Sequence, residues 1–176
     1  MVPEAPLEET EHGAVPAGGG WFVLNAQDAR WFDSDGMGVY TSFEGDDRFA
    51  DVGIGIGILQ PGEPNAMYHG DGAQEDFLVI FGKCLLIVEG EERLLGAWDF
   101  VHCPAWTEHV FIGAGDGPCI VLGVGARTQG RGVRYVVNDV ALRYDAGVAE
   151  ETSEPSVAYV RFAQDRPRRA PKIPPI

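Results

Sequence analysis

Two stretches of the chain decide its fold. Residues 61–82 read PGEPNAMYHGDGAQEDFLVIFG, and residues 98–113 read WDFVHCPAWTEHVFIG. Each holds a short apolar run that begins beside an ionisable side chain and ends at a glycine. Short apolar runs bounded by Gly and Pro residues are typical of β-strands joined by tight turns. The two stretches therefore predict strands that carry acids and histidines near their ends.

The same rhythm continues on both sides of these stretches. Strand-like runs cover residues 39–43, 52–60, 77–81, 84–89, 100–103, 109–112, 118–124 and 133–137. Strands that recur about every 8–12 residues, without long amphipathic helices between them, favour an antiparallel sandwich or barrel. The 24 glycines and 12 prolines agree with a chain that turns often. We therefore predict an all-β fold.

The regions outside these runs have weaker patterns. Residues 21–24 predict a short strand, and Asn25 is placed to cap a helical turn that runs to residue 30. Apolar residues at helical spacing predict a short helix over residues 137–144. Residues 157–162 predict a last strand that covers a sheet edge.

The chain is predicted to form one domain, because 176 residues would leave two separate cores near the lower size limit. We place this domain at residues 20–163, with a barrel core at about 52–125. Residues 1–19 are rich in Pro, Gly and Glu and predict a mobile lead-in. Residues 164–176 form a basic Pro- and Arg-rich tail, which is either solvated or docked on an acidic surface of this chain or a partner.

Charge and hydropathy narrow the classes of partner. The net charge of −14 repels phosphate backbones, which argues against a nucleic-acid partner. The sequence has no apolar run of about 18 residues, so no transmembrane helix is predicted. The acidic residues 1–10 are unlike a secretory signal, so a cytoplasmic location is predicted.

The three cysteines, Cys84, Cys103 and Cys119, lie in apolar strand-like runs and have no CxxC spacing. We expect buried free thiols, not disulfides or zinc ligands. A nucleophilic Cys103 is the alternative.

Glycine alternates with β-branched residues over residues 52–58, at Gly53, Gly55 and Gly57. The GxGxxG pattern is absent and a Pro-Gly turn follows, so no nucleotide cofactor is predicted. A strand of this composition carries side chains on one face and only glycine backbone on the other. That face lets either another backbone or a bound molecule approach closely.

The two quoted stretches resemble the two motifs of the cupin superfamily, usually written G(X)5HXH(X)3–4E(X)6G and G(X)5PXG(X)2H(X)3N. Gly62, Glu75 and Gly82 match the first motif, and Pro104 and His109 match the second. The resemblance implies an antiparallel double-stranded β-helix, the cupin or jelly-roll barrel, with short peripheral helices.

The chain departs from the first motif at its two histidines. Counted without a gap from Gly62, those positions fall on Tyr68 and Gly70. One extra residue places them on His69 and Asp71, which keeps a metal-ligand type at each position. We favour the second alignment and keep the first open.

The second motif departs from the family pattern as well. Trp98 and Trp106 stand where the family usually has glycines, and Gly113 stands where it has asparagine. The resemblance therefore bears more on the fold than on the metal.

In a cupin barrel the two motif strands face each other, so their polar side chains converge. The candidate metal ligands are His69, Glu75, His109 and Asp71. The candidate pocket residues are Tyr68, Phe77, Phe111 and His102, with a structural role on an outer face open for His102. Such nitrogen and oxygen ligands suit a divalent transition metal, namely Fe, Mn, Ni, Zn or Co.

Three functions agree with this prediction. The first is a metal-dependent oxygenase or isomerase of a small molecule. The second is a non-catalytic module that binds a sugar or small acid, and the third is a metal-free barrel kept for dimer formation. The resemblance also implies a homodimer that pairs through an outer sheet face.

Overall fold

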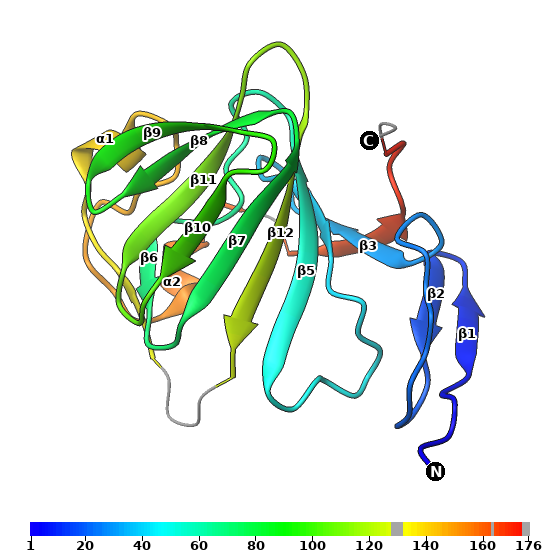
Figure 1. The fold of residues 1–176 in the computed structure, drawn as a ribbon. Helices are drawn as coiled ribbons and strands as arrows, with labels where there is room; N and C mark the ends of the chain where they lie inside the picture. The colour runs from blue at the N-terminus through cyan, green and yellow to red at the C-terminus, as the bar shows by residue number, and fades with distance from the viewer. Residues whose placement is uncertain (128–131, 163, 174–176) are drawn as a thin grey trace.

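The computed structural model describes residues 1–127, 132–162 and 164–173. The chain is built from antiparallel strands arranged as a jelly-roll β-barrel, as predicted (Figure 1). One sheet has the order β10 (Phe100–Cys103), β7 (Glu75–Phe81), β12 (Cys119–Ala126), β5 (Val52–Leu59), β4 (Val39–Thr41), β3 (Arg30–Asp33) and β14 (Arg166–Arg169). The other has the order β13 (Val133–Tyr135), β6 (His69–Asp71), β11 (Glu108–Ala114), β8 (Lys83–Val88) and β9 (Glu91–Gly96).

The core lies between these two sheets. Alternate residues of each strand point inward, and the buried cluster that results contains Leu59, Phe77, Val79, Cys84, Leu86, Cys103, Phe111, Cys119 and Val121. A second cluster lies on the opposite face of the smaller sheet, where Val110 and Ile87 pack near helix α1 (Asp139–Leu142). The strand alternation thus assigns each side chain to the barrel interior or to an outer layer.

Most of the predicted strands are present. Six strands in the described part of the chain were not predicted, of which β3, β6 and β9 lie between residues 20 and 163. Strand β9 lies at the edge of its sheet, its first four residues are exposed, and it begins with three charged residues, so it lacks the apolar run that predicts a strand. Strands β3 and β6 are short, at four and three residues. Apolar periodicity over so few residues gives little signal.

The last strand predicted at residues 157–162 is wrong. That segment begins instead with helix α2 (Pro155–Ala158), which has Pro155 in its first turn. Proline at that position is favourable, because its ring presets the helical φ angle and the missing N–H has no helical partner there. The helix predicted over 137–144 is confirmed in shorter form as α1, capped by the Asn138 side chain.

Of the two predictions for residues 21–30, the strand at 21–24 is wrong and the turn capped by Asn25 is present in shorter form. Trp21 forms an isolated bridge to Glu4 and no strand. The Asn25 side chain accepts a hydrogen bond from the Gln27 amide at 2.9 Å, and the Asn25 carbonyl accepts one from the Ala29 amide at 3.1 Å. Asn25 therefore caps a single turn, as predicted, and the turn ends before Arg30, which begins β3. Asn favours such local turns as readily as helix caps.

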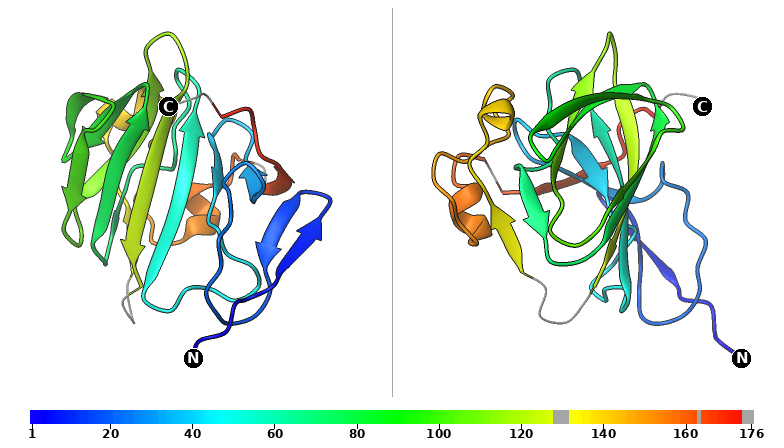
Figure 2. Two further views of the ribbon diagram at one scale, coloured as in Figure 1. Left: turned by 45° about the vertical axis from the view of Figure 1, so that its right-hand side comes forward. Right: turned by 60° about the vertical axis from the view of Figure 1, so that its left-hand side comes forward.

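The two ends of the chain have more structure than their composition indicates. Strands β1 (Leu7–Thr10) and β2 (Gly13–Pro16) form a hairpin beside β3 (Figure 2), with Ala14 and Val15 buried. The mobility predicted for residues 1–19 stays a prediction. Among the described residues, no helix is long and apolar enough to cross a membrane.

The basic tail docks on acids of its own chain. Strand β14 pairs with β3, Arg168 lies 2.8 Å from Asp33, and Arg166 lies 2.7 Å from Asp35. Of the two predictions made for the tail, the docked arrangement is the one observed up to residue 173. Residues 174–176 lie outside the described residues.

Candidate metal centre

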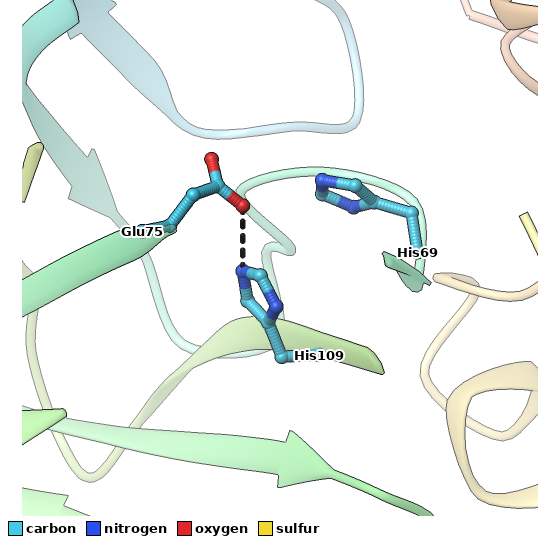
Figure 3. Close-up of side chains that lie close together, drawn as sticks. All are labelled: His69, Glu75 and His109. Atoms are coloured by element: carbon cyan, nitrogen blue, oxygen red, sulfur yellow. Dashed lines mark ion pairs between the residues drawn. The ribbon is translucent and has the colours of Figure 1, made fainter. Parts of the chain in front are cut away.

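Three strands bring His69, Glu75 and His109 together. His69 on β6 is the direct cross-strand partner of His109 on β11, while Glu75 reaches them from β7 of the facing sheet (Figure 3). One ligand atom from each of the three residues can be chosen so that all lie within 4.8 Å of one another. His109 Nε2 and Glu75 Oε2 are 3.6 Å apart. This spacing allows all three side chains to contact one ion.

Backbone contacts fix the orientation of both imidazoles. His69 Nδ1 lies 2.7 Å from the Met67 carbonyl, and His109 Nδ1 lies 3.0 Å from the Thr107 carbonyl. Because a carbonyl only accepts, each Nδ1 carries a hydrogen, and in the neutral imidazole Nε2 is then the unprotonated nitrogen. Histidines that bind metals are commonly held in this way. The donor set therefore fits a divalent metal.

The surroundings of His109 favour its neutral form. Burial lowers the pKa of His109, and the nearby charge of His69 lowers it further. The His109 ring also packs against the Phe77 ring, with centroids 5.1 Å apart. Neutral imidazole is the form that binds a metal, so this apolar wall supports a ligand role.

The fourth candidate ligand, Asp71, does not join the group. Its Oδ1 accepts a hydrogen bond from the Ala73 amide at 2.9 Å, in the tight turn that leaves β6. Within the described part of the chain, the ligand group consists of His69, Glu75 and His109. Asp71 nevertheless lies close enough for its charge to act on His109.

Two predicted pocket residues point away from the barrel interior, which corrects their assignment. Tyr68 neighbours His69 on the chain, so it projects to the opposite side, where it belongs to the outer apolar cluster and accepts the Gly90 amide. His102 is exposed on the outer face, and its Nδ1 lies 2.6 Å from Asp76 Oδ1. The outer-face role that was left open for His102 is the one observed.

The other two predicted pocket residues lie inside the barrel. The rings of Phe77 and Phe111 pack with centroids 4.7 Å apart. Phe77 lines a cavity of about 300 Å³, whereas Phe111 is fully buried behind it. Phe77 thus contacts both the candidate ligand His109 and the cavity.

The structure adds a neighbour that sequence reasoning missed. The Tyr135 ring lies 5.7 Å from the His69 ring, because β13 pairs with β6 and sets the two residues opposite each other. Tyr159 packs edge-on against Tyr135, and its hydroxyl accepts the Met67 amide at 3.1 Å. No local pattern marks these tyrosines, since the pairing that brings them here is long-range.

The alternating glycines of β5 serve both purposes that were considered. A Cβ at Gly55 would lie 2.9 Å from the Thr41 carbonyl oxygen, so strand packing requires a glycine there. Gly53 and Gly57 line the cavity, together with Gly123 of β12. The strand is therefore both closely packed and a cavity wall.

The backbone conformation at Trp98 and Trp106 explains why cupins usually have glycine at these positions. Trp98 has φ 76° and Trp106 has φ 71°, in the left-handed region that favours glycine. Both side chains are exposed. The chain thus has a backbone conformation that favours glycine at both positions, although the residues there are tryptophans.

The cysteines are free and buried, as predicted. Burial, followed by the charge of Glu75, raises the pKa of Cys103 to about 11. A thiol with such a pKa is almost fully protonated near neutral pH and is a poor nucleophile. This argues against the catalytic alternative for Cys103.

The structure is an antiparallel barrel whose interior carries a His, Glu and His group that could hold a metal ion. Residues 55–125 match the family model described as "Cupin domain". The chain therefore contains a cupin domain. No curated protein sequence matches the chain significantly.

Solved structures agree with this fold. A proposed sugar phosphate isomerase from Acidithiobacillus ferrooxidans is 24% identical with a TM-score of 0.50, over 55% of this chain and 63% of its own. A sugar phosphate isomerase of the cupin superfamily from Silicibacter pomeroyi is 24% identical with a TM-score of 0.50, over 63% of this chain and 68% of its own. At this identity the likeness shows the fold alone.

Proposed function

We propose that this chain is a metal-dependent cupin enzyme, an oxygenase or isomerase that acts on a small molecule. The observation that carries the proposal is the ligand group of His69, Glu75 and His109, with ligand atoms within 4.8 Å of one another. A divalent ion held there would supply Lewis-acid or redox chemistry. The cavity lined by Phe77, whose ring packs against His109, offers space for an organic molecule.

The donor set supports the metal more strongly than it supports any one reaction. Two neutral imidazoles and one carboxylate suit Fe, Mn, Ni, Zn or Co. They leave coordination positions open for water or substrate, as catalytic sites require. The isomerase class also occurs among the described relatives. Oxygen uptake in the presence of a substrate would select the oxygenase, and turnover without oxygen would select the isomerase.

Metal analysis tests the proposal directly. Full-length protein purified without an affinity tag is expected to contain about one transition-metal ion per chain. His109→Ala should lose the ion, because it removes a buried ligand. His102→Ala is the matched control, since that imidazole lies on the outer face against Asp76. Wild-type protein that binds no divalent metal, or His109→Ala that retains it, would contradict the proposal.

A non-catalytic binding module is the second candidate, supported by the same cavity. Protein that binds a small ligand equally well with and without metal, and shows no turnover, would favour the binding module.

We also propose that the chain forms a homodimer, is located in the cytoplasm and has no nucleic-acid partner. Exposed Phe100 on edge strand β10 supports a dimer, and a monomer by light scattering at micromolar concentration would contradict it.

A further inference from the structure

One wall of the cavity lined by Phe77 consists mainly of glycine backbone. Five glycines of the adjacent strands β5 and β12 face the barrel interior, and two cross-strand pairs join Gly55 to Gly123 and Gly53 to Gly125. Glycine weakens a strand interior, because it loses more backbone freedom on folding and has no side chain to pack. Each of these positions therefore needs a reason.

At four of the five glycines a Cβ would contact other atoms of the protein. A Cβ would lie 2.9 Å from the Thr41 oxygen at Gly55 and 3.3 Å from the Phe77 ring at Gly123. It would lie 3.4 Å from the Glu75 carboxylate at Gly125. At Gly53 it would lie 3.3 Å from the Arg127 guanidinium. These glycines make room for the chain's own side chains and backbone.

Gly57 is different. A Cβ there would meet no protein atom within 4 Å, and its φ is not in the left-handed region. Gly57 nevertheless lines the cavity of about 300 Å³, together with Val121, its cross-strand partner on β12, and Phe77 on β7 of the same sheet. Neither packing nor backbone conformation requires glycine at this position. The space above Gly57 is open to a bound molecule.

The charges at the cavity are already paired. Arg127 and Glu44 both line it, and Arg127 Nη2 lies 2.8 Å from Glu44 Oε1. Arg127 also donates to the Phe49 carbonyl oxygen. Among the described residues that line the cavity, Arg127 is the only cationic one. A phosphate or carboxylate ligand would therefore have to compete with Glu44 for Arg127. This arrangement disfavours an anionic ligand.

We infer that the cavity binds a flat, uncharged and largely apolar ring compound, which lies on the Gly57 backbone beside the Phe77 ring. This inference rests on the proposed function, because it names the substrate class of the same site. Leu59, Phe77 and Val121 supply apolar walls. The peptide surface at Gly57 supplies a flat floor, and such pockets, apolar with few polar groups, suit small organic ligands. Gly57 is then a specificity-determining residue.

Binding of 2-naphthol to the metal-depleted full chain, measured by calorimetry, tests the inference. Wild-type protein should bind it saturably, and glucose 6-phosphate should bind more weakly. Gly57→Val should weaken 2-naphthol binding about tenfold or more, since its methyl groups occupy the ligand's space. Gly57→Ala should weaken it less and raise Tm by about 1–4 °C, because alanine restricts the unfolded chain without a clash.

Gly96→Ala is the matched control. Gly96 ends strand β9, and a Cβ there also meets nothing within 4 Å, but it does not line the cavity. It should bind 2-naphthol as the wild type does. Three results would each overturn the inference: no saturable binding by the wild type, equal binding by Gly57→Val, or tighter binding of glucose 6-phosphate. A lower Tm for Gly57→Ala would also overturn it, since the fold would then require the glycine.

The measurement uses metal-depleted protein, so it separates two failures. If metal analysis fails while 2-naphthol still binds above Gly57, the ligand cavity stands and the proposed enzyme does not. If the chain binds metal and the cavity rejects 2-naphthol, the metal centre stands and the substrate class is wrong.

Discussion

His69 and His109 face each other across the paired strands β6 and β11, with ring centroids 5.2 Å apart and an interplanar angle of 41°. Each ring donates through Nδ1 to the carbonyl two residues before it. The same local device therefore orients both imidazoles, and both present Nε2 as the nitrogen available to a ligand.

Replacing Glu75 by glutamine should weaken metal binding while the barrel stays folded. The amide keeps the size of the side chain but removes the negative charge that faces His109 Nε2. We expect a loss in affinity of at least about 10–100-fold, the range found for residues that only orient metal ligands. Competition with a chromophoric chelator would measure it. Asp76→Asn is the control, since Asp76 points to the outer face. Equal losses in both variants would contradict the assignment.

Asp71→Asn should bind metal as tightly as the wild type. The Asp71 side chain accepts the Ala73 amide, and the asparagine carbonyl can accept the same hydrogen bond. Titration of the metal-free variant by calorimetry checks this. A strong loss of affinity would instead show that Asp71 moves into the ligand group when metal binds.

The ion pair of Glu44 and Arg127 should contribute to stability above mildly acidic pH. Although burial opposes it, hydrogen bonds from Arg127 and the Phe49 amide lower the pKa of Glu44 below its ordinary 4.5. A lowered carboxyl pKa means that the stabilisation is complete above about pH 4.5 and is lost as the pH falls through the folded-state value. Glu44→Gln should cost about 1.5–3 kcal/mol at pH 7.

Urea unfolding from pH 7 to pH 3 tests this pair. The difference in unfolding free energy between wild type and Glu44→Gln should shrink as the pH falls below 4.5. Exposed Glu8 in β1 gives the control variant Glu8→Gln, which should follow the wild type. A difference that stays constant with pH would exclude the ion pair as its source.

The thiols should react with Ellman's reagent only after unfolding. Cys84 and Cys119 are fully buried, and burial raises the pKa of Cys103 to about 11. The thiolate is the reactive form, so buried protonated thiols react slowly. We expect none of the three to react within minutes in native protein and all three in guanidinium chloride. Rapid native labelling of Cys103 would revive its nucleophilic role.

The sequence predicts the barrel well because strand alternation and turn residues are local signals. The run over residues 100–103 agrees with β10 at both ends, and residues 52–60 differ from β5 by one residue. Glu75 and His109 could be singled out because each lies at a recognisable position of a motif. His69 required a choice between two alignments, since one inserted residue reverses which face a strand side chain occupies.

What the sequence could not predict depends on long-range pairing. Tyr135 reaches His69 only because β13 adds to the edge of β6. Strand β14 of the tail pairs with β3, and Arg166 and Arg168 form ion pairs with Asp35 and Asp33, which are far from them in the sequence. Composition leaves both a solvated and a docked tail open, because it contains no information about the surface that receives the tail.

The origin of the three ligands from two different sheets has a mechanical consequence. Glu75 belongs to the sheet of β7, and the two histidines belong to the sheet of β11. An ion bound by all three residues would cross-link the two sheets of the barrel, and separating the sheets would release it. Ion occupancy and global unfolding would then be coupled, with about 2.7 kcal/mol added at a hundredfold excess over Kd.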